Sequence, residues 1–320
     1  MTRFTLKQLA YFVAAGEAGS VTLAAGRVHI SQPSISAAIA ALEDEFGVQL
    51  FVRHHAQGLS PTPAGERLLI AARDLLRTAD DLGNLARDMA GGGAGGGAGG
   101  VVGPLRIGAF RTLSPLILPE LVAGFAAANP GVDLTMVEHD EAELVARLRK
   151  GEIDLALSYA QAADDIAFEC LAELPTHVVV AADHPLAGRR TVALADLADD
   201  PFILLDMPVS RDTFRALFDA AGLPMRPAAR SDQPETIRSM VGSGLGYALM
   251  TARPAARVAA NGRPLAYLAL DEAFAPMQLG ILTARSRRQT RAATAFADFC
   301  RARIATDRLP GMADLGVTPA

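Results

Sequence analysis

Residues 20–47 read SVTLAAGRVHISQPSISAAIAALEDEFG and predict two helices joined by a tight turn. Ser20 and Ser31 are placed to cap these helices, because a serine hydroxyl accepts a hydrogen bond from a free N–H in the first turn. Pro33 falls in the first turn of the second helix, where a missing N–H is harmless. That helix ends at Gly47 and has a buried stripe made of Ile35, Ile39, Leu42 and Phe46. The pattern is typical of a helix-turn-helix.

The flanking residues extend this motif to a domain over residues 1–62. The preceding helix has apolar residues at three- and four-residue spacing, namely Leu6, Leu9, Phe12 and Val13. The segment LFVRHHAQGLSPT, residues 50–62, predicts two short strands around a turn at Gly58, which would form a wing. Together these elements predict a winged helix-turn-helix.

The start of the third helix presents polar side chains where recognition helices meet base edges in the major groove. These side chains are Gln32, Ser34 and Ser36. Glutamine can pair with adenine through two hydrogen bonds, and serine is more permissive. Ordinary solvated residues at a helix start show the same pattern, so the spacing alone leaves both interpretations open.

A long helix is predicted over residues 63–90, starting after a Thr62–Pro63 cap. Its apolar residues fall seven positions apart at Leu68, Leu75, Leu82 and Met89. Such a heptad seam favours pairing with a second helix, so we expect a dimerisation helix. Packing of the same face on the chain's own domain is the alternative.

Residues 90–103, AGGGAGGGAGGVVG, are unlike the rest of the chain. We expect a flexible hinge over residues 91–103, with an inserted spacer as the alternative. Ten residues of such a Gly-rich chain reach roughly 16–19 Å.

From residue 104 the pattern changes to alternating strands and helices, which predicts an α/β domain with mostly parallel strands and right-handed crossovers. Two lobes are expected within 104–307. Lobe I covers about 104–163 and 268–307, lobe II covers about 164–267, and a tail follows over 308–320. Helix starts near residues 112, 210 and 232 carry capping side chains and offer free N–H groups to an anion, although capping alone also explains each of them.

Composition excludes several classes of protein. The net charge of −5 does not indicate nucleic-acid binding, and no apolar run is long enough for a membrane span. The first residues lack the uninterrupted apolar stretch of a signal peptide, and the two cysteines, Cys170 and Cys300, are too far apart for a C-x-x-C motif. A cytoplasmic protein with reduced thiols fits best. We find no nucleophile elbow, dinucleotide fingerprint or zinc spacing, so we expect no enzyme activity, cofactor or metal.

The run from Leu6 to Glu66 resembles the amino-terminal domain of LysR-type transcriptional regulators, through its SQP-S–I–LE–LF-R–T–G progression. The LRKGEIDLAL, HPLA and GSGLGYALM segments resemble that family's effector domain more loosely. The resemblance implies a winged helix-turn-helix, a dimerising linker helix and a two-lobed effector domain similar to periplasmic binding proteins. One departure is Ala37–Ala38, where the family often has Arg or Gln. Since the third helix lacks basic residues, we expect modest DNA affinity and a shallow salt dependence.

The resemblance also implies site residues. The candidate DNA contacts are Thr22, Arg27, Ser31, Gln32, Pro33, Ser34, Ser36 and Arg53. The candidate effector contacts between the lobes are Thr112, Ser114, His139, Ser210, Arg211 and Gln233. The expected protein is a transcriptional regulator that binds an inverted repeat in promoter DNA as a homodimer or homotetramer and is switched by a small, anionic effector. The alternative is a solute-binding protein or small-molecule sensor without DNA binding.

Overall fold

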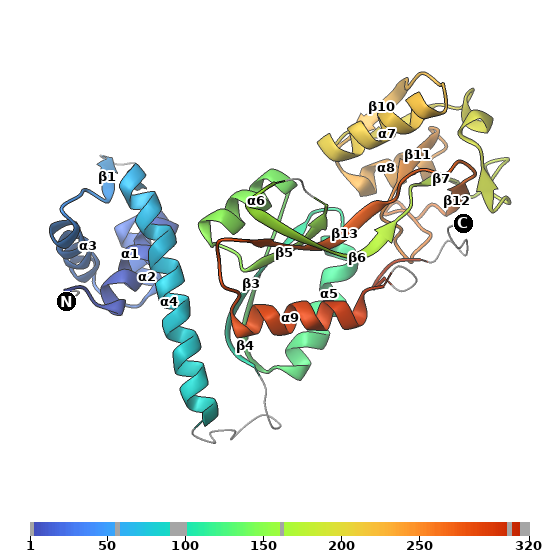
Figure 1. Ribbon diagram of the computed structural model, residues 1–320. Helices are drawn as coiled ribbons and strands as arrows, with labels where there is room; N and C mark the ends of the chain where they lie inside the picture. Colours follow the sequence, from blue (N-terminus) through green and yellow to red (C-terminus); the bar gives the residue numbers. More distant parts are fainter. Residues whose placement is uncertain (1–2, 55–57, 90–100, 161–162, 306–308, 314–320) are drawn as a thin grey trace.

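The computed structural model describes residues 3–54, 58–89, 101–160, 163–305 and 309–313. An N-terminal helical unit is followed by a long helix and by a C-terminal part built on two sheets (Figure 1). The predicted hinge lies outside the described residues except for its last three positions. Of these, Val102 and Gly103 belong to the first strand of the C-terminal part, so the hinge ends earlier than expected.

The N-terminal unit has the predicted winged helix-turn-helix architecture. Its elements are α1 (Leu6–Ala18), α2 (Val21–Arg27), α3 (Gln32–Phe46), β1 (Phe51–His54) and β2 (Gly58–Pro61). Ser20 and Ser31 cap α2 and α3 as expected, each accepting a backbone N–H at 3.4 Å. Gly58 allows the wing to approach α1, because a Cβ there would lie 2.4 Å from the Gly19 carbonyl oxygen.

The long helix α4 (Pro63–Met89) begins where the Thr62–Pro63 pair predicts, with Thr62 Oγ1 accepting the Gly65 N–H at 3.0 Å. Its first turns pack on the N-terminal unit, with Leu69 and Ala72 buried in that core. The alternative of own-domain packing therefore applies to this part of α4. Farther along, Leu75 and Leu82 are 42% and 66% exposed.

Lobe I contains the first sheet, with the strand order β4-β3-β5-β13-β6. Strand β3 is parallel to β4 and β5, whereas β13 is antiparallel to β5 and β6. The strands are β3 (Val102–Phe110), β4 (Gly131–His139), β5 (Leu155–Tyr159), β6 (Ile166–Leu174) and β13 (Met277–Ala284). The helices are α5 (Ser114–Ala128), α6 (Glu141–Lys150) and α9 (Arg291–Arg303). The βαβαβ unit predicted for this lobe is confirmed.

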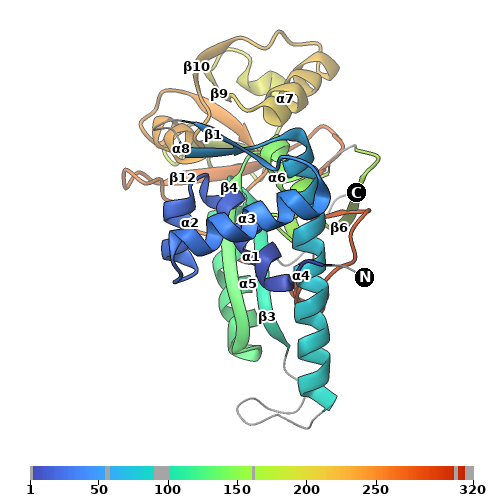
Figure 2. The ribbon, with the colours of Figure 1, turned by 90° about the vertical axis from the view of Figure 1, so that its left-hand side faces the viewer.

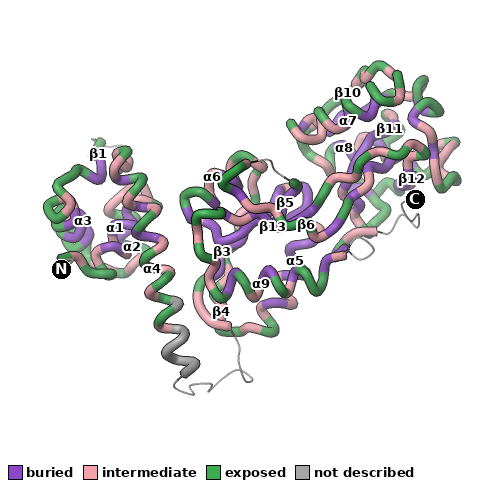
Figure 3. Tube along the Cα trace, in the orientation of Figure 1, coloured by how far each residue is buried: buried purple, intermediate pink, exposed green. Residues whose placement is uncertain are grey.

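Lobe II contains the second sheet, with the strand order β10-β9-β11-β7-β12-β8. The strands are β7 (His177–Ala181), β8 (Thr191–Val192), β9 (Phe202–Leu205), β10 (Pro227–Ser231), β11 (Tyr247–Met250) and β12 (Leu265–Leu270). The helical segments are a 3₁₀ turn (Leu194–Leu197), α7 (Pro208–Ala220) and α8 (Pro234–Gly242). Buried residues follow the strands of both lobes (Figure 3).

Two predictions about the lobes need correction. The expected boundaries near 163/164 and 267/268 are wrong, because β6 pairs along its length with β13 in lobe I and β12 pairs with β7 in lobe II. The chain therefore crosses between the lobes after β6 and again between β12 and β13. Helix α7 begins at Pro208, so Ser210 lies within its first turn and does not precede it.

The C-terminal segment touches both lobes. Ala313 N–H donates to the Arg253 carbonyl oxygen at 2.8 Å, and Gly311 packs against the backbone of Leu116 in α5. No single helix in the described ranges is long and apolar enough to cross a membrane. Only the α1–α2 pair passes such a test by length and composition, and it is bent by 119°.

Candidate DNA interface and effector cleft

The start of α3 forms an exposed polar surface. The exposed candidates are Thr22, Arg27, Ser31, Gln32, Pro33, Ser34 and Arg53, while Ser36 is half-buried. Ser31 and Ser34 hydrogen-bond through their hydroxyl oxygens, which lie 2.8 Å apart. This bond holds two small hydroxyls side by side at the helix N-terminus, where α3 also presents the Gln32 amide.

The wing is held against α3 by backbone contacts. Glu43 of α3 accepts the Leu50 N–H at 2.8 Å, so this carboxylate is used within the domain. His54 Nε2 and Ser60 Oγ lie 2.8 Å apart across the hairpin, and Arg53 of β1 is exposed. The wing therefore presents an exposed guanidinium, whereas α3 carries no basic residue.

A chain of hydroxyl groups joins the two lobes. Tyr159 Oη, at the carboxyl end of β5, lies 3.5 Å from Thr112 Oγ1 and 3.1 Å from Thr251 Oγ1. Thr112 follows β3 in lobe I, and Thr251 follows β11 in lobe II. Burial raises the pKa of Tyr159, so its hydroxyl stays protonated and can donate a hydrogen bond.

The helices of the molecule differ in how their first turns are capped. Side chains cap α1, α2, α3, α6 and α9. In contrast, no side chain caps the first N–H groups of α5, α7 or α8. The capping predicted for Thr112, Ser210 and Asp232 is therefore wrong. These three helices follow β3, β9 and β10, where an open α/β sheet places its ligands, and they leave donors available there.

The remaining effector candidates are spread over both lobes. Ser114, 1% exposed, lies in the first turn of α5, and half-buried His139 ends β4. Arg211 donates to Asp206 at 2.6 Å, and Gln233 is exposed before α8. Within the described residues, no hydrogen bond or ion pair brings Ser210, Arg211 or Gln233 to Thr112. The group that meets Thr112 is Tyr159, which in turn meets Thr251, and sequence reasoning missed both.

A signal for the two missed residues is present in the sequence. Tyr159 ends a predicted strand, and Thr251 directly follows another predicted strand, YALM. Polar groups at the carboxyl ends of such strands gather at one edge of a sheet. Their meeting, however, depends on how the lobes pack, over a separation of 92 positions.

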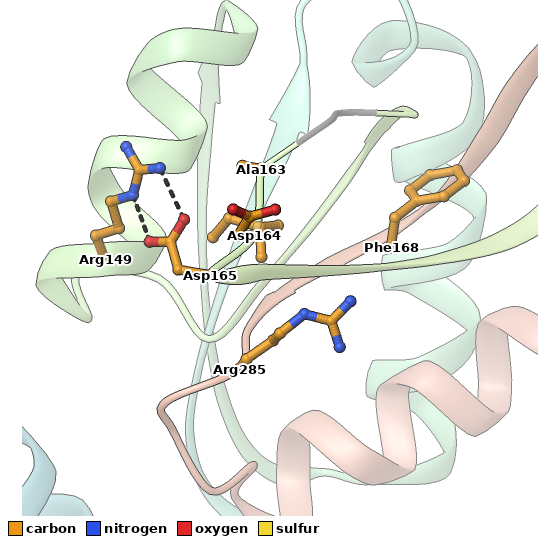
Figure 4. A pocket seen from close by; sticks show the side chains of 7 residues that line it. Arg149, Ala163, Asp164, Asp165, Phe168 and Arg285 are labelled. Carbon is orange, nitrogen blue, oxygen red and sulfur yellow. Dashed lines mark hydrogen bonds and ion pairs between the residues drawn. The ribbon is translucent and has the colours of Figure 1, made fainter.

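A separate open pocket of about 860 Å³ lies at the start of β6 (Figure 4). Arg149 and Asp165 form two hydrogen bonds across its wall, at 2.7 and 2.9 Å. With Arg285 and Asp164 in the same lining, positive and negative charges balance. This pocket therefore shows no preference for an anion or a cation.

Neither a metal site nor a pair of reactive thiols is visible in the part of the chain that the structure describes. No group of three His, Cys, Asp or Glu side chains there is placed to hold an ion. Both cysteines are free. Desolvation and nearby Glu173 raise the pKa of Cys170, and burial raises that of Cys300 to about 12.

Comparison with protein families settles the class of the molecule. Residues 98–305 match the family model described as LysR substrate binding domain, and residues 6–66 match that of the bacterial regulatory helix-turn-helix protein, lysR family. The chain belongs to the LysR family. It is a DNA-binding transcriptional regulator with an effector-binding domain. Because the helix-turn-helix match lies in the same chain, a solute-binding protein without DNA binding is not favoured.

Three known proteins illustrate the likeness. The hydrogen peroxide-inducible genes activator of Pectobacterium carotovorum is 31% identical over 249 residues, which cover 77% of this chain and 80% of that protein. HinK, a LysR family regulator from Pseudomonas aeruginosa, is 36% identical, with a TM-score of 0.63 over 94% of this chain and 99% of HinK. Full-length CbnR in complex with its target DNA is 26% identical, with a TM-score of 0.55 over 93% of this chain and 99% of CbnR. LysR-type regulators bind DNA and small-molecule effectors and form oligomers, and these partners apply to this regulator.

Proposed function

We propose that the regulator responds to a small anionic effector that binds between the lobes, at the edge where α5, α7 and α8 begin. The observation that carries this proposal is the contrast in capping. These helices start with N–H groups that no side chain satisfies, and each start carries a partial positive charge. Thr112, Tyr159 and Thr251 add neutral hydroxyl donors, which suit a carboxylate or a similar anion.

For DNA, the proposed contacts are the start of α3 and the wing. Gln32, Ser34 and Ser36 would meet base edges, and Arg27 and Arg53 would meet phosphates. The exposed Leu75 and Leu82 of α4 support pairing with a second copy, which would present two reading heads to an inverted repeat. We place the regulator in the cytoplasm and assign it no enzymatic role.

The name of the peroxide-responsive relative raises the question of redox sensing in this chain. A sensor thiol needs a lowered pKa and access to solvent, because the thiolate is the reactive form. Cys170 is exposed but its pKa is raised, and Cys300 is buried with its pKa raised to about 12. We therefore infer that binding of an effector, and not oxidation of a thiol, switches this regulator.

The proposal is tested by thermal unfolding with a panel of carboxylates, phosphates and neutral analogues of the same size. An anion that binds between the lobes raises the melting temperature of the parent protein, by an amount that grows with the logarithm of its concentration once the site is largely occupied. The Thr112→Val variant should lose this shift and keep its DNA affinity within about threefold, a small change on the scale of 1.4 kcal/mol per tenfold. Equal loss of both properties would show that Thr112 has only a structural role.

A further inference from the structure

The long helix α4 contacts lobe I through arginines that meet the end of α6. Arg73 Nη1 donates to the Lys150 carbonyl oxygen at 3.1 Å, and Arg77 Nη2 donates to the Gly151 carbonyl oxygen. The last carbonyl groups of a helix lack partners within it and carry partial negative charge. The end of α6 is therefore a site for cations, and α4 supplies two of them.

Carboxylates complete this contact. Asp154, 5% exposed, lies 3.3 Å from Arg77 through Oδ1, and its Oδ2 accepts the Arg106 N–H at 2.8 Å. On the α4 side, Asp74 Oδ1 lies 2.8 Å from Nη1 of Arg287, which follows β13. We name the set Arg73, Arg77, Asp74, Arg287 and Lys150–Asp154 the arginine junction.

The same junction reaches the DNA-binding unit. Arg73, 6% exposed, also donates from Nε to Glu17 of α1 at 3.3 Å. One side chain therefore contacts the winged helix-turn-helix and lobe I at once. Figure 1 shows α4 between these two parts, and Figure 2 shows it alongside β3.

Packing at the junction is close and depends on one glycine. Gly151 has a φ of +64°, and a Cβ there would lie 1.5 Å from Arg287 Nη1. Any side chain at this position would push the guanidinium away. The side chains of Arg77 and Arg287 are only 13% and 6% exposed, and this burial lowers the pKa of both. Buried charges of this kind tolerate little displacement of their partners.

The strands of lobe I connect the junction to the effector cleft. Asp154 directly precedes β5, whose other end is Tyr159. Arg106 lies in the middle of β3, whose carboxyl end leads to Thr112. Arg287 follows β13, which pairs with β5. Strands β5 and β13 thus have one end beside the junction and the other beside the hydroxyl chain, and β3 runs from its middle at the junction to its carboxyl end at the hydroxyl chain.

We propose that the arginine junction, and not the glycine-rich stretch, sets the orientation of the DNA-binding unit on lobe I of the same chain. It joins residues on both sides of that stretch directly. A consequence for regulation rests on the proposed function. If an effector moves lobe I, the contacts of Arg73 and Arg77 transmit that movement to α1 and α3.

Electron–electron distance measurements on the full-length protein test this proposal without DNA or effector. One spin label is placed on native Cys170 in lobe I, which is exposed, and the other on α3 through Glu45→Cys. Buried Cys300 is replaced by Ser. Labelled chains are mixed with an excess of unlabelled chains, so that only distances within one chain are recorded. The parent protein should give one narrow distance distribution.

Two independent changes should broaden that distribution. Arg77→Ala removes the contacts with Gly151 and Asp154, while Arg67→Ala changes an exposed arginine of the same helix and is the control. Gly151→Ala displaces Arg287, while Gly222→Ala adds a methyl group at a similar φ of +68° with no atom within 4 Å. Without the junction, the Gly-rich stretch would be the remaining link, and its reach of roughly 16–19 Å sets the scale on which the distribution should widen.

A parent-like distribution in folded Arg77→Ala and Gly151→Ala would overturn the proposal. Circular dichroism establishes that each variant is folded. If Arg77→Ala unfolds, Arg77→Lys replaces it, because lysine keeps the positive charge but lacks the guanidinium fork. The Arg77→Lys variant should broaden the distance distribution less than Arg77→Ala. The rise in melting temperature that anions cause in the parent protein is measured in parallel. If the distances behave as expected but no anion raises the melting temperature, the junction stands and the proposed function fails. The reverse outcome refutes the junction alone.

Discussion

Tyr159 joins the two lobes through one phenolic hydroxyl. Tyr159→Phe removes this group, leaves Thr112 and Thr251 without their shared partner, and keeps the ring against Phe110. We expect a loss of about 1–2 kcal/mol, the usual cost of leaving buried partners unsatisfied. This corresponds to a decrease in melting temperature of about 2–8 °C. Tyr11→Phe, which changes a half-buried tyrosine of α1, is the control. Equal decreases in melting temperature for the two variants would contradict a special role for Tyr159.

His177 makes the stability depend on pH in a defined direction. Burial, with Arg253 and Arg238 nearby, lowers the pKa of His177 well below 6.5, so the folded protein keeps it neutral. The unfolded chain binds a proton below about pH 6.5. Stability is therefore fully present above that pH and is lost as the pH falls from about 6.5 toward the folded pKa, by at most about 1.4 kcal/mol per unit.

The His177→Phe variant isolates this contribution, because it keeps a ring against Tyr267. Its melting temperature should fall less than that of the parent between pH 7.5 and 5.5. Parallel melting curves for the two proteins over this range would show that His177 does not titrate on unfolding.

The two thiols should not mediate a response to peroxide. Because the pKa values of Cys170 and Cys300 are raised, little thiolate exists at neutral pH. Exposure of the purified regulator to hydrogen peroxide at low millimolar concentration should leave its DNA affinity within about twofold, a difference below 1.4 kcal/mol. A large change in affinity that Cys170→Ser abolishes would contradict this expectation.

Among the elements, α4 contributes to three contact surfaces. Its first turns pack on the N-terminal unit, its arginines meet lobe I, and its exposed leucines remain for a partner. Leu75→Glu with Leu82→Glu should weaken dimerisation by at least tenfold, because two charges would be buried in an apolar seam. Sedimentation velocity measures the change, and Arg67→Glu on the same helix is the control. A dimer of unchanged stability would place the interface elsewhere.

Local patterns predicted the elements that local physics determines. Ser31 and Pro33 mark the start of α3, Gly47 marks its end, and both ends lie where the sequence places them. The start of α7 was placed too late, although Pro208 is a first-turn signal of the same kind. Strand β6 was not predicted, because Glu169 and Cys170 interrupt its apolar pattern and only its pairing with β13 makes it a strand of lobe I.

At the scale of the whole molecule, the contacts that matter most are between residues far apart in the chain. Arg77 meets Gly151, and Tyr159 meets Thr251, across separations of 74 and 92 positions. No periodicity in one segment encodes such a meeting. The sequence therefore predicts that a DNA-binding unit and a two-lobed domain exist. The junction between them and the hydroxyl contact between the lobes depend on tertiary packing.

The central claim is that α3 of this LysR-type regulator reads specific DNA. Footprinting of the purified protein on the DNA that flanks its own gene tests this claim most directly. We predict protection of an inverted repeat, with a shallow salt dependence because α3 has no basic residue, and loss of that protection in Gln32→Ala with Ser34→Ala. Equal affinity for flanking and scrambled DNA, or protection that the double variant retains, would contradict the account.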